Sequence, residues 1–168
     1  MCPGGVVVPA ASEEGGVVTN GMSYHARDGR NSNAALAVSV LPEDFGGSAI
    51  GAISFQRELE HKAFAAGGGN FAAPMQPVGK FLGGSGSVKD VVPTYMNGKV
   101  TETDLASVLP DFVSDMLMVG IRKFGEKISG FDAPDAVLTG VETRTSAPVR
   151  IMRGEDRRIT FGGNIYPC

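Results

Sequence analysis

The polar loop at residues 20–33 holds the side chains of this sequence that are best suited to proton transfer and anion binding. Tyr24, His25 and Arg27 lie within four positions of one another. An imidazole changes charge near neutral pH, a phenol is a weak acid, and a guanidinium binds carboxylates and phosphates. Long loops inside compact domains are often functional. We therefore predict Tyr24, His25 and Arg27 as catalytic residues, with an ordinary surface loop as the alternative.

A second polar group follows in the last third of the chain. Arg144, Thr145 and Ser146 stand between two predicted strands, at residues 136–143 and 148–152. A guanidinium beside hydroxyl groups suits a carboxylate, a phosphate or a flavin carbonyl. A simple hairpin turn explains the same three residues equally well, and both interpretations stay open.

Other catalytic patterns are weaker. Cys2 and His25 would make a sensible nucleophile and base, but nothing in the sequence places them together. His61 falls on the polar side of a predicted helix, which is typical of a surface histidine. The glycines at 83–86 do not follow a clear strand, so they are not a dinucleotide-binding loop. The two cysteines stand at opposite ends of the chain, with neither a disulfide framework nor metal-ligand spacing.

The elements that would position these residues begin with strands. Val-rich segments predict strands at 5–9 and 16–19, and an apolar run predicts another at 34–41. Apolar residues at helical spacing then predict a helix at 49–66, which the glycines at 67–69 would end with a left-handed cap.

The second half is predicted to be helical and then extended. We expect a short helix at 77–82, another from the polar cap at 101–104 to Val108, and a longer helix beginning at Pro110 and stopping near Gly130. Its apolar stripe is interpreted as core packing and consists of Val113, Met116, Leu117, Ile121, Phe124 and Ile128. Strands are predicted at 136–143, 148–152 and 158–166. This order indicates an α+β domain with a mixed β-sheet and a few helices.

Length and composition limit the classes of protein to which this chain can belong. The 168 residues predict a single domain that spans residues 1–168, and a net charge of −3 argues against a nucleic-acid partner. No apolar run approaches the roughly 20 residues of a membrane span. With few cysteines and no signal peptide, we expect a cytoplasmic protein. Glycine occurs 24 times, which indicates many tight turns or backbone close to a ligand.

Both ends of the chain influence the domain prediction. The predicted strand at 158–166 runs almost to the terminus, and the apolar run at 6–8 starts with no leader before it. We therefore expect these residues to be one segment of a larger protein, with part of its machinery outside them.

Several motifs together resemble a known family. The resemblance rests on stretches that follow one another along the whole chain: residues 1–5, 13–24, 27–29, 55–60, 67–70, 109–113 and 141–146. In this order they are similar to the bacterial FAD-dependent dehydrogenases, also called NAD(FAD)-utilising dehydrogenases. The matching region of that family is its C-terminal, substrate-side part, a domain inserted into a glutathione-reductase-like flavoprotein.

The resemblance implies a cofactor and its contacts. FAD would be bound mainly by parts of the parent protein that are missing from this chain, with NAD(P)H as a candidate electron donor. Tyr166, Pro167 and Cys168 would lie near the flavin, and the segment with Cys2, Gly4 and Gly5 would face the flavin or the substrate. The same holds for the turn formed by Arg144, Thr145 and Ser146.

Two functions are therefore carried forward. The first is the substrate-side domain of an FAD-dependent oxidoreductase, inactive as this segment alone, whose partners are the remainder of the flavoprotein chain and a small-molecule substrate. The alternative is a stand-alone, non-catalytic module that binds a small molecule or another protein through the loop at 20–33.

Overall fold

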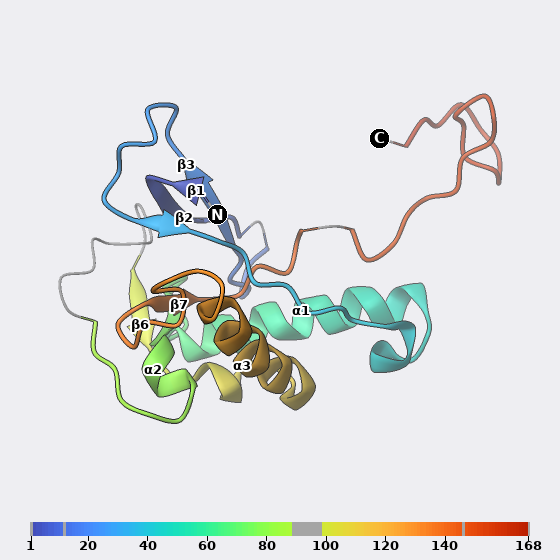
Figure 1. The fold of residues 1–168 in the computed structure, drawn as a ribbon. Helices are drawn as coiled ribbons and strands as arrows, with labels where there is room; N and C mark the ends of the chain where they lie inside the picture. The colour runs from blue at the N-terminus through green and yellow to red at the C-terminus, as the bar shows by residue number, and fades with distance from the viewer. Residues whose placement is uncertain (1, 12, 89–98, 146, 168) are drawn as a thin grey trace.

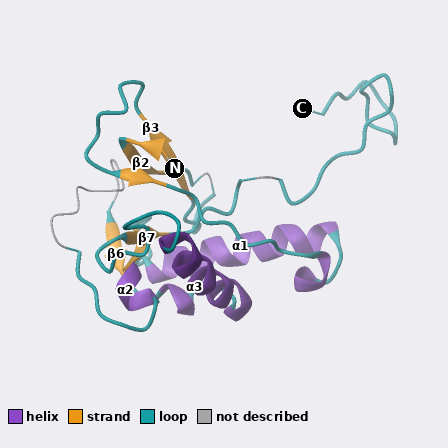
Figure 2. Cartoon of the chain, in the orientation of Figure 1, coloured by secondary structure: helices purple, strands orange, loops and turns teal. Residues whose placement is uncertain are grey.

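The computed structural model describes residues 2–11, 13–88, 99–145 and 147–167 (Figure 1). Its strands are β1 (Cys2–Pro3), β2 (Gly5–Pro9), β3 (Thr19–Ser23), β4 (Ser32–Asn33), β5 (Ala73–Pro77), β6 (Val100–Glu102) and β7 (Val137–Thr139). Its α-helices are α1 (Ala49–Ala66), α2 (Val78–Phe81) and α3 (Asp111–Gly125), and its 3-10 helices are η1 (Pro42–Phe45) and η2 (Leu105–Ser107). The predicted mixture of short strands and few helices is confirmed (Figure 2).

The N-terminal strands form two small antiparallel pairs. β2 pairs with β3, with Gly5 opposite Ser23 and Pro9 opposite Thr19, and β1 pairs with β4. The strand predicted at 16–19 therefore lies a few residues later in the chain. Val17 does not join the ladder because its N–H donates to the carbonyl of Glu60 on α1, at 3.0 Å, and its side chain is fully buried.

A three-stranded mixed sheet lies beside the helices, in the order β6-β5-β7. Its central strand, β5, runs parallel to β6 and antiparallel to β7, and all five of its residues are buried. The sequence did not predict β5, because Pro74 and Pro77 argue against a central strand. Their missing N–H groups are tolerated because the strand is short and its ladder uses other groups, such as the Pro74 carbonyl, which accepts from Gly140 at 3.0 Å.

Helix α1 has the predicted bounds. The hydroxyl of Ser48 accepts a hydrogen bond from the N–H of Gly51 at 2.9 Å, which caps its first turn. At the other end Gly67 is still right-handed, and the left-handed residues are Gly68 and Gly69, with φ of 100° and 71°. These two glycines turn the chain back toward β5.

Helix α3 is found where it was predicted, but its apolar stripe is only partly core. Ile121 is buried and packs with Val78, Phe81 and Leu105, with Leu117 at the edge of this cluster. Met116 and Phe124 are exposed, because only one side of α3 faces the rest of the described structure. The helix ends at Gly125, before the Gly130 predicted as its stop.

Three predicted strands do not form. Residues 34–41 and 148–152 are irregular, and 158–166 contributes only a single bridge, between Arg153 and Ile159. The described part of the chain places no strand of the sheets beside any of these segments. Residues 147–167 lead away from the body of the molecule, as the red end of the ribbon in Figure 1 shows.

Candidate functional site

The structure separates the predicted site residues into three groups. Cys2, Gly4 and Gly5 lie at the same end of the molecule as the loop with Tyr24, His25 and Arg27. Arg144 and Thr145 lie beside α1, whereas Tyr166 and Pro167 belong to the segment that leads away from the body. Ser146 and Cys168 fall outside the described residues.

The first group is built around a close crossing of two backbone segments, residues 4–5 and 27–29, which we call the glycine crossing. Gly4 has φ of +65°, and a Cβ atom there would lie 2.5 Å from the carbonyl carbon of Arg27. A Cβ on Gly29 would lie 2.8 Å from the carbonyl oxygen of Gly4. Real Cβ atoms do not approach backbone so closely, so both positions require glycine.

Hydrogen bonds hold the loop in place above this crossing. The N–H of Gly5 donates to the carbonyl of Asn31 at 2.9 Å, and the N–H of Arg27 donates to the carbonyl of Tyr24 at 3.0 Å. The side-chain amide of Asn33 donates to the carbonyl of Val6 at 3.0 Å. Arg27 itself has φ of +53°, a conformation that is uncommon outside glycine and asparagine.

The side chains of this group face solvent. Tyr24 is half exposed, and His25, Arg27 and the free thiol of Cys2 are exposed. The crossing therefore presents a phenol, an imidazole and a guanidinium on one tightly turned loop. No hydrogen bond joins the described side chains of Cys2 and His25, so the structure does not show them as a nucleophile and its base.

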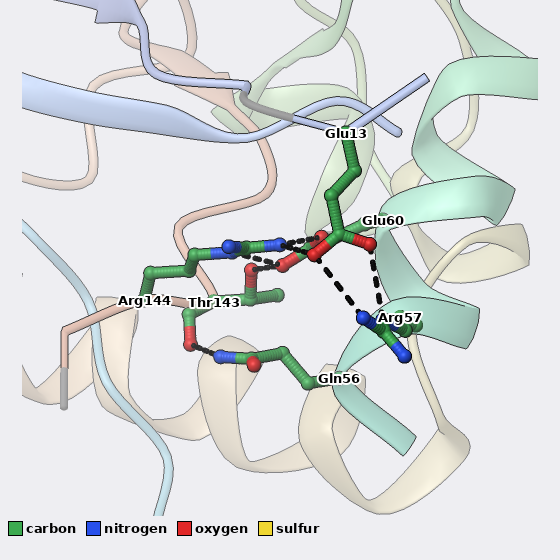
Figure 3. Close-up of polar contacts among 6 residues, drawn as sticks. All are labelled: Glu13, Gln56, Arg57, Glu60, Thr143 and Arg144. Atoms are coloured by element: carbon green, nitrogen blue, oxygen red, sulfur yellow. Dashed lines mark hydrogen bonds and ion pairs between the residues drawn. The ribbon is translucent and has the colours of Figure 1, made fainter. Parts of the chain in front are cut away.

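Arg144 lies in an ion-pair cluster that joins three distant parts of the sequence (Figure 3). Its guanidinium donates to both carboxylate oxygens of Glu60, at 2.9 and 2.8 Å, and to Glu13 at 3.1 Å. The hydroxyl of Thr143 adds a bond of 2.6 Å to Glu60. Glu60 is the buried member of the cluster, with a side chain only 2% exposed.

The charges in this cluster stabilise one another. Burial alone would raise the pKa of the Glu60 carboxyl, but the hydrogen bonds from Arg144 and Thr143 outweigh it, so the pKa lies below its ordinary value. The pKa of Glu13 is also lowered, first by Arg144 and then by Arg57. The pKa of Arg144 is raised by Glu60 and Glu13, which keeps the guanidinium charged.

The Arg144 segment is therefore docked onto the body of the molecule. The side-chain amide of Gln56 donates to the carbonyl of Thr143 at 2.6 Å, and the N–H of Thr19 donates to the carbonyl of Val141 at 2.8 Å. The hairpin expected around this turn does not form, because no strand follows at 148–152. The guanidinium is engaged by carboxylates of the chain itself, so its nearest function here is to hold Glu60.

Sequence reasoning placed Glu60 on a polar face of its helix and missed its burial. The available signal was its spacing from the small residues Ala52 and Ala63, which are also buried and leave room on that side of α1 for a partner. A carboxylate on a small-residue face needs a cation from elsewhere in the chain. The sequence does not show that this cation is Arg144.

One depression among the described residues can be compared with the shape and charge of FAD, and it does not fit. A shallow depression of about 460 Å³ is lined by Ser85, Gly86, Ser87, Pro134 and Asp135. Its charged side chain is the carboxylate of Asp135, which would repel the diphosphate of a dinucleotide. Among the described residues, no group of His, Cys, Asp and Glu side chains could hold a metal ion, and no helix is long and apolar enough to cross a membrane.

Comparison with known protein families identifies the family of this chain. Residues 1–145 match the family model described as "FAD-dependent protein, C-terminal domain-like". The chain belongs to this family. The match ends one residue after Arg144, where the docked part of this FAD-dependent C-terminal domain also ends, and residues 147–167 lie beyond it. The expected kinship with C-terminal segments of FAD-dependent proteins is confirmed.

A relative shows how such a domain occurs in a longer chain. An uncharacterized protein of Clostridium beijerinckii (strain ATCC 51743 / NCIMB 8052) is 51% identical over 170 residues. The alignment covers 99% of this chain and 32% of the relative. The FAD-dependent C-terminal domain therefore spans about a third of the length of the curated relative that it matches.

Proposed function

We propose that this chain is the substrate-side domain of an FAD-dependent oxidoreductase of the dehydrogenase type, related to glutathione-reductase-like flavoproteins. The observation that carries the proposal is the family match over residues 1–145. The relative, about three times as long, has room for a separate FAD-binding part. When bound, FAD would supply the redox chemistry.

The glycine crossing is the proposed contribution of this domain to the active site. Its rigid backbone fixes a loop on which Arg27 would bind an anionic substrate group or a flavin carbonyl, and Tyr24 or His25 would hold or transfer a proton. Cys2, Gly4 and Gly5 would bring backbone close to the same ligand. A small-molecule substrate and an NAD(P)H donor are part of the proposal.

Arg144 has a positioning role in this proposal. Its bonds to Glu60 and Glu13 anchor the chain at the point from which residues 147–167 depart. Thr145 follows the anchor directly, and Tyr166 and Pro167 lie at the far end of the departing segment. We propose that this segment reaches the flavin-binding part of a longer polypeptide.

The second candidate is a binding module without redox activity. It is favoured by the exposure of Tyr24, His25 and Arg27 on a loop that hydrogen bonds within the chain hold in place. Such a loop could bind a small anion or a peptide carboxylate by itself. The two candidates differ in whether the complete polypeptide retains a flavin.

The test is the visible absorption spectrum of the polypeptide expressed from its complete reading frame and purified without added cofactor. We expect a flavin band that stays with the protein through gel filtration. A colourless, folded protein that also fails to take up added FAD would overturn the oxidoreductase proposal and favour the binding module.

A variant then tests the glycine crossing. Arg27→Asn keeps a residue that tolerates positive φ and removes the guanidinium. We expect it to weaken FAD binding in a titration. Arg57→Met, which removes an exposed arginine on α1, serves as the control. Equal behaviour of the two variants would remove Arg27 from the site.

A further inference from the structure

The carboxylate of Glu13 lies between two arginines that come from distant parts of the chain (Figure 3). Arg57 on α1 donates to one carboxylate oxygen from Nε at 3.0 Å and to the other from a terminal nitrogen at 3.5 Å. Arg144 donates from a terminal nitrogen at 3.1 Å. A guanidinium that spans both oxygens is the usual geometry of carboxylate recognition by arginine. We call Arg57 and Arg144 the arginine pair.

Arg144 does not depend on Glu13 for its position. Its Nε and a terminal nitrogen donate to the two oxygens of the buried Glu60, at 2.9 and 2.8 Å. The same terminal nitrogen also reaches Glu13, which is possible because each terminal nitrogen of a guanidinium carries two hydrogens. If the Glu13 side chain left, Glu60 would still hold Arg144, and one of its N–H groups would be open to another acceptor.

Glu13 is held less firmly than Glu60, because its ion pairs lie at the surface. The side chain of Glu13 is 37% exposed, whereas that of Glu60 is 2% exposed. Exposed ion pairs add little stability, since water and salt screen them. Glu13 also begins a turn that stands clear of the body, and nothing lies within 4 Å of a Cβ atom at Gly15. The Glu13 side chain can therefore turn into solvent without disturbing the core.

The charges of the cluster select one kind of ligand. Without Glu13, the cluster consists of two guanidinium groups and the carboxylate of Glu60, which leaves a single positive charge. One further carboxylate restores neutrality and matches the geometry that Glu13 occupies. A phosphate monoester carries a charge of about −1.5 to −2 at neutral pH, which is more than the arginine pair would balance. The ligand that fits best is therefore a carboxylate.

We propose that the arginine pair is a binding site for the carboxylate of a small-molecule ligand, and that Glu13 closes this site as an internal competitor. The ligand takes the N–H groups that Glu13 releases, while Glu60 keeps Arg144 in place. The site is additional to the positioning role of Arg144, because the two contacts use different N–H groups. It is also independent of the flavin, since FAD has no carboxylate and all four side chains belong to the described residues.

Binding of trifluoroacetate to the complete polypeptide tests the proposal. The fluorine NMR line width of this carboxylate is followed in a titration, with sodium chloride keeping the ionic strength constant. Glu13→Ala removes the internal competitor and vacates its space. Glu14→Ala is the matched control, because it removes the same charge from the exposed neighbouring residue. Glu13→Gln keeps the shape of the side chain and removes only its charge, so it serves as a second variant.

Glu13→Ala is expected to bind trifluoroacetate at least about fivefold more tightly than the wild type, in which the probe must first displace Glu13. Glu14→Ala should match the wild type, and Glu13→Gln should lie between the wild type and Glu13→Ala. Equal dissociation constants for the wild type and both Glu13 variants would overturn the proposal. So would tight binding that persists in the double variant Glu13→Ala/Arg57→Met, because the probe would then lie elsewhere.

Discussion

The carboxylate of Glu60 joins distant parts of this fold. It is nearly inaccessible to solvent, and a buried charge is stable only when it is paired and hydrogen-bonded. Arg144 and Thr143 supply those bonds from a position more than 80 residues later in the chain. The interaction therefore joins the last docked residues of the domain to α1. A buried pair of this kind can add little net stability while making the loss of one partner costly.

Replacing Arg144 by Met should therefore destabilise the protein by about 2–3 kcal/mol, somewhat less than the loss from a fully buried pair because Arg144 is about a third exposed. Arg57→Met is the matched control, since Arg57 pairs with the same Glu13 on the exposed side of the cluster and should cost less than about 1 kcal/mol. Urea unfolding measures both. Equal losses would mean that Glu60 does not depend on Arg144.

The stability of the cluster should depend on pH with a defined sign. The folded-state pKa values of Glu60 and Glu13 are lowered from an ordinary value of 4.5, so their contribution is present above that pH and is lost as the pH falls through the folded pKa values. In Arg144→Met the buried Glu60 loses its cation and its pKa rises. The stability difference between wild type and variant should shrink from about pH 6 to about pH 3. A difference that stays constant in urea titrations across this range would contradict the assignment.

At the scale of elements, the glycine crossing decides whether the candidate site exists. β1, β2 and the loop after β3 pass so close together that a side chain at Gly4 or Gly29 would overlap backbone atoms. Positive φ at a glycine is common and explains little by itself. The short approach of Gly4 to Arg27 and Gly29 is the feature that holds the loop with Tyr24 and His25 against residues 4–5.

Two alanine substitutions separate the cost of backbone strain from the cost of steric overlap at the glycine crossing. Gly15 has φ of +75° with nothing within 4 Å of a Cβ atom, so Gly15→Ala should cost about 1–2 kcal/mol from backbone strain. Gly4→Ala should cost about 1–3 kcal/mol more, because the methyl group also displaces the Arg27 backbone. Thermal or urea unfolding gives both values. A smaller effect at Gly4 would show that the two segments separate easily.

At the scale of the whole molecule, the chain divides at the Arg144 cluster into a docked body and the segment at 147–167. The hydrogen bonds of this described segment join its own residues, for example Arg158 to Tyr166 at 3.1 Å and Arg153 to the carbonyl of Pro167. Its exposed apolar side chains include Ile151, Phe161 and Ile165. The match to the family of FAD-dependent C-terminal domains ends at the same place.

Removing residues 148–168 should therefore change the free energy of unfolding by less than about 1 kcal/mol, because the body keeps its own contacts. Removing residues 141–168 should abolish cooperative unfolding, since Val141 belongs to the core and Arg144 holds Glu60. Far-UV circular dichroism with urea compares the two. A large loss from the shorter deletion would show that the segment packs on the body in solution.

The local pattern determined the two long helices, α1 and α3, whereas the helix predicted from 101–104 to Val108 is the strand β6 followed by the 3-10 helix η2. The apolar spacing and the Ser48 cap and glycine triplet set the bounds of α1, and Pro110 marked the start of α3. These signals act between residues at most a few positions apart, so the sequence contains them completely. The motifs along the chain were likewise sufficient to indicate a C-terminal segment of an FAD-dependent protein.

Only the tertiary structure decided the rest. β5 forms despite its two prolines because burial on both sides outweighs its weak strand propensity. Residues 34–41 and 158–166 do not form strands of a sheet, because no other strand in the described residues lies beside them. Glu60 was expected at the surface and is buried, and Met116 was expected in the core and is exposed. The environment of a helix face depends on what packs against it. The pairing of Glu60 with Arg144, and the crossing of Gly4 with Arg27, join residues far apart in the chain. Such contacts are set by the packing of the whole chain, and no local pattern in the sequence specifies them.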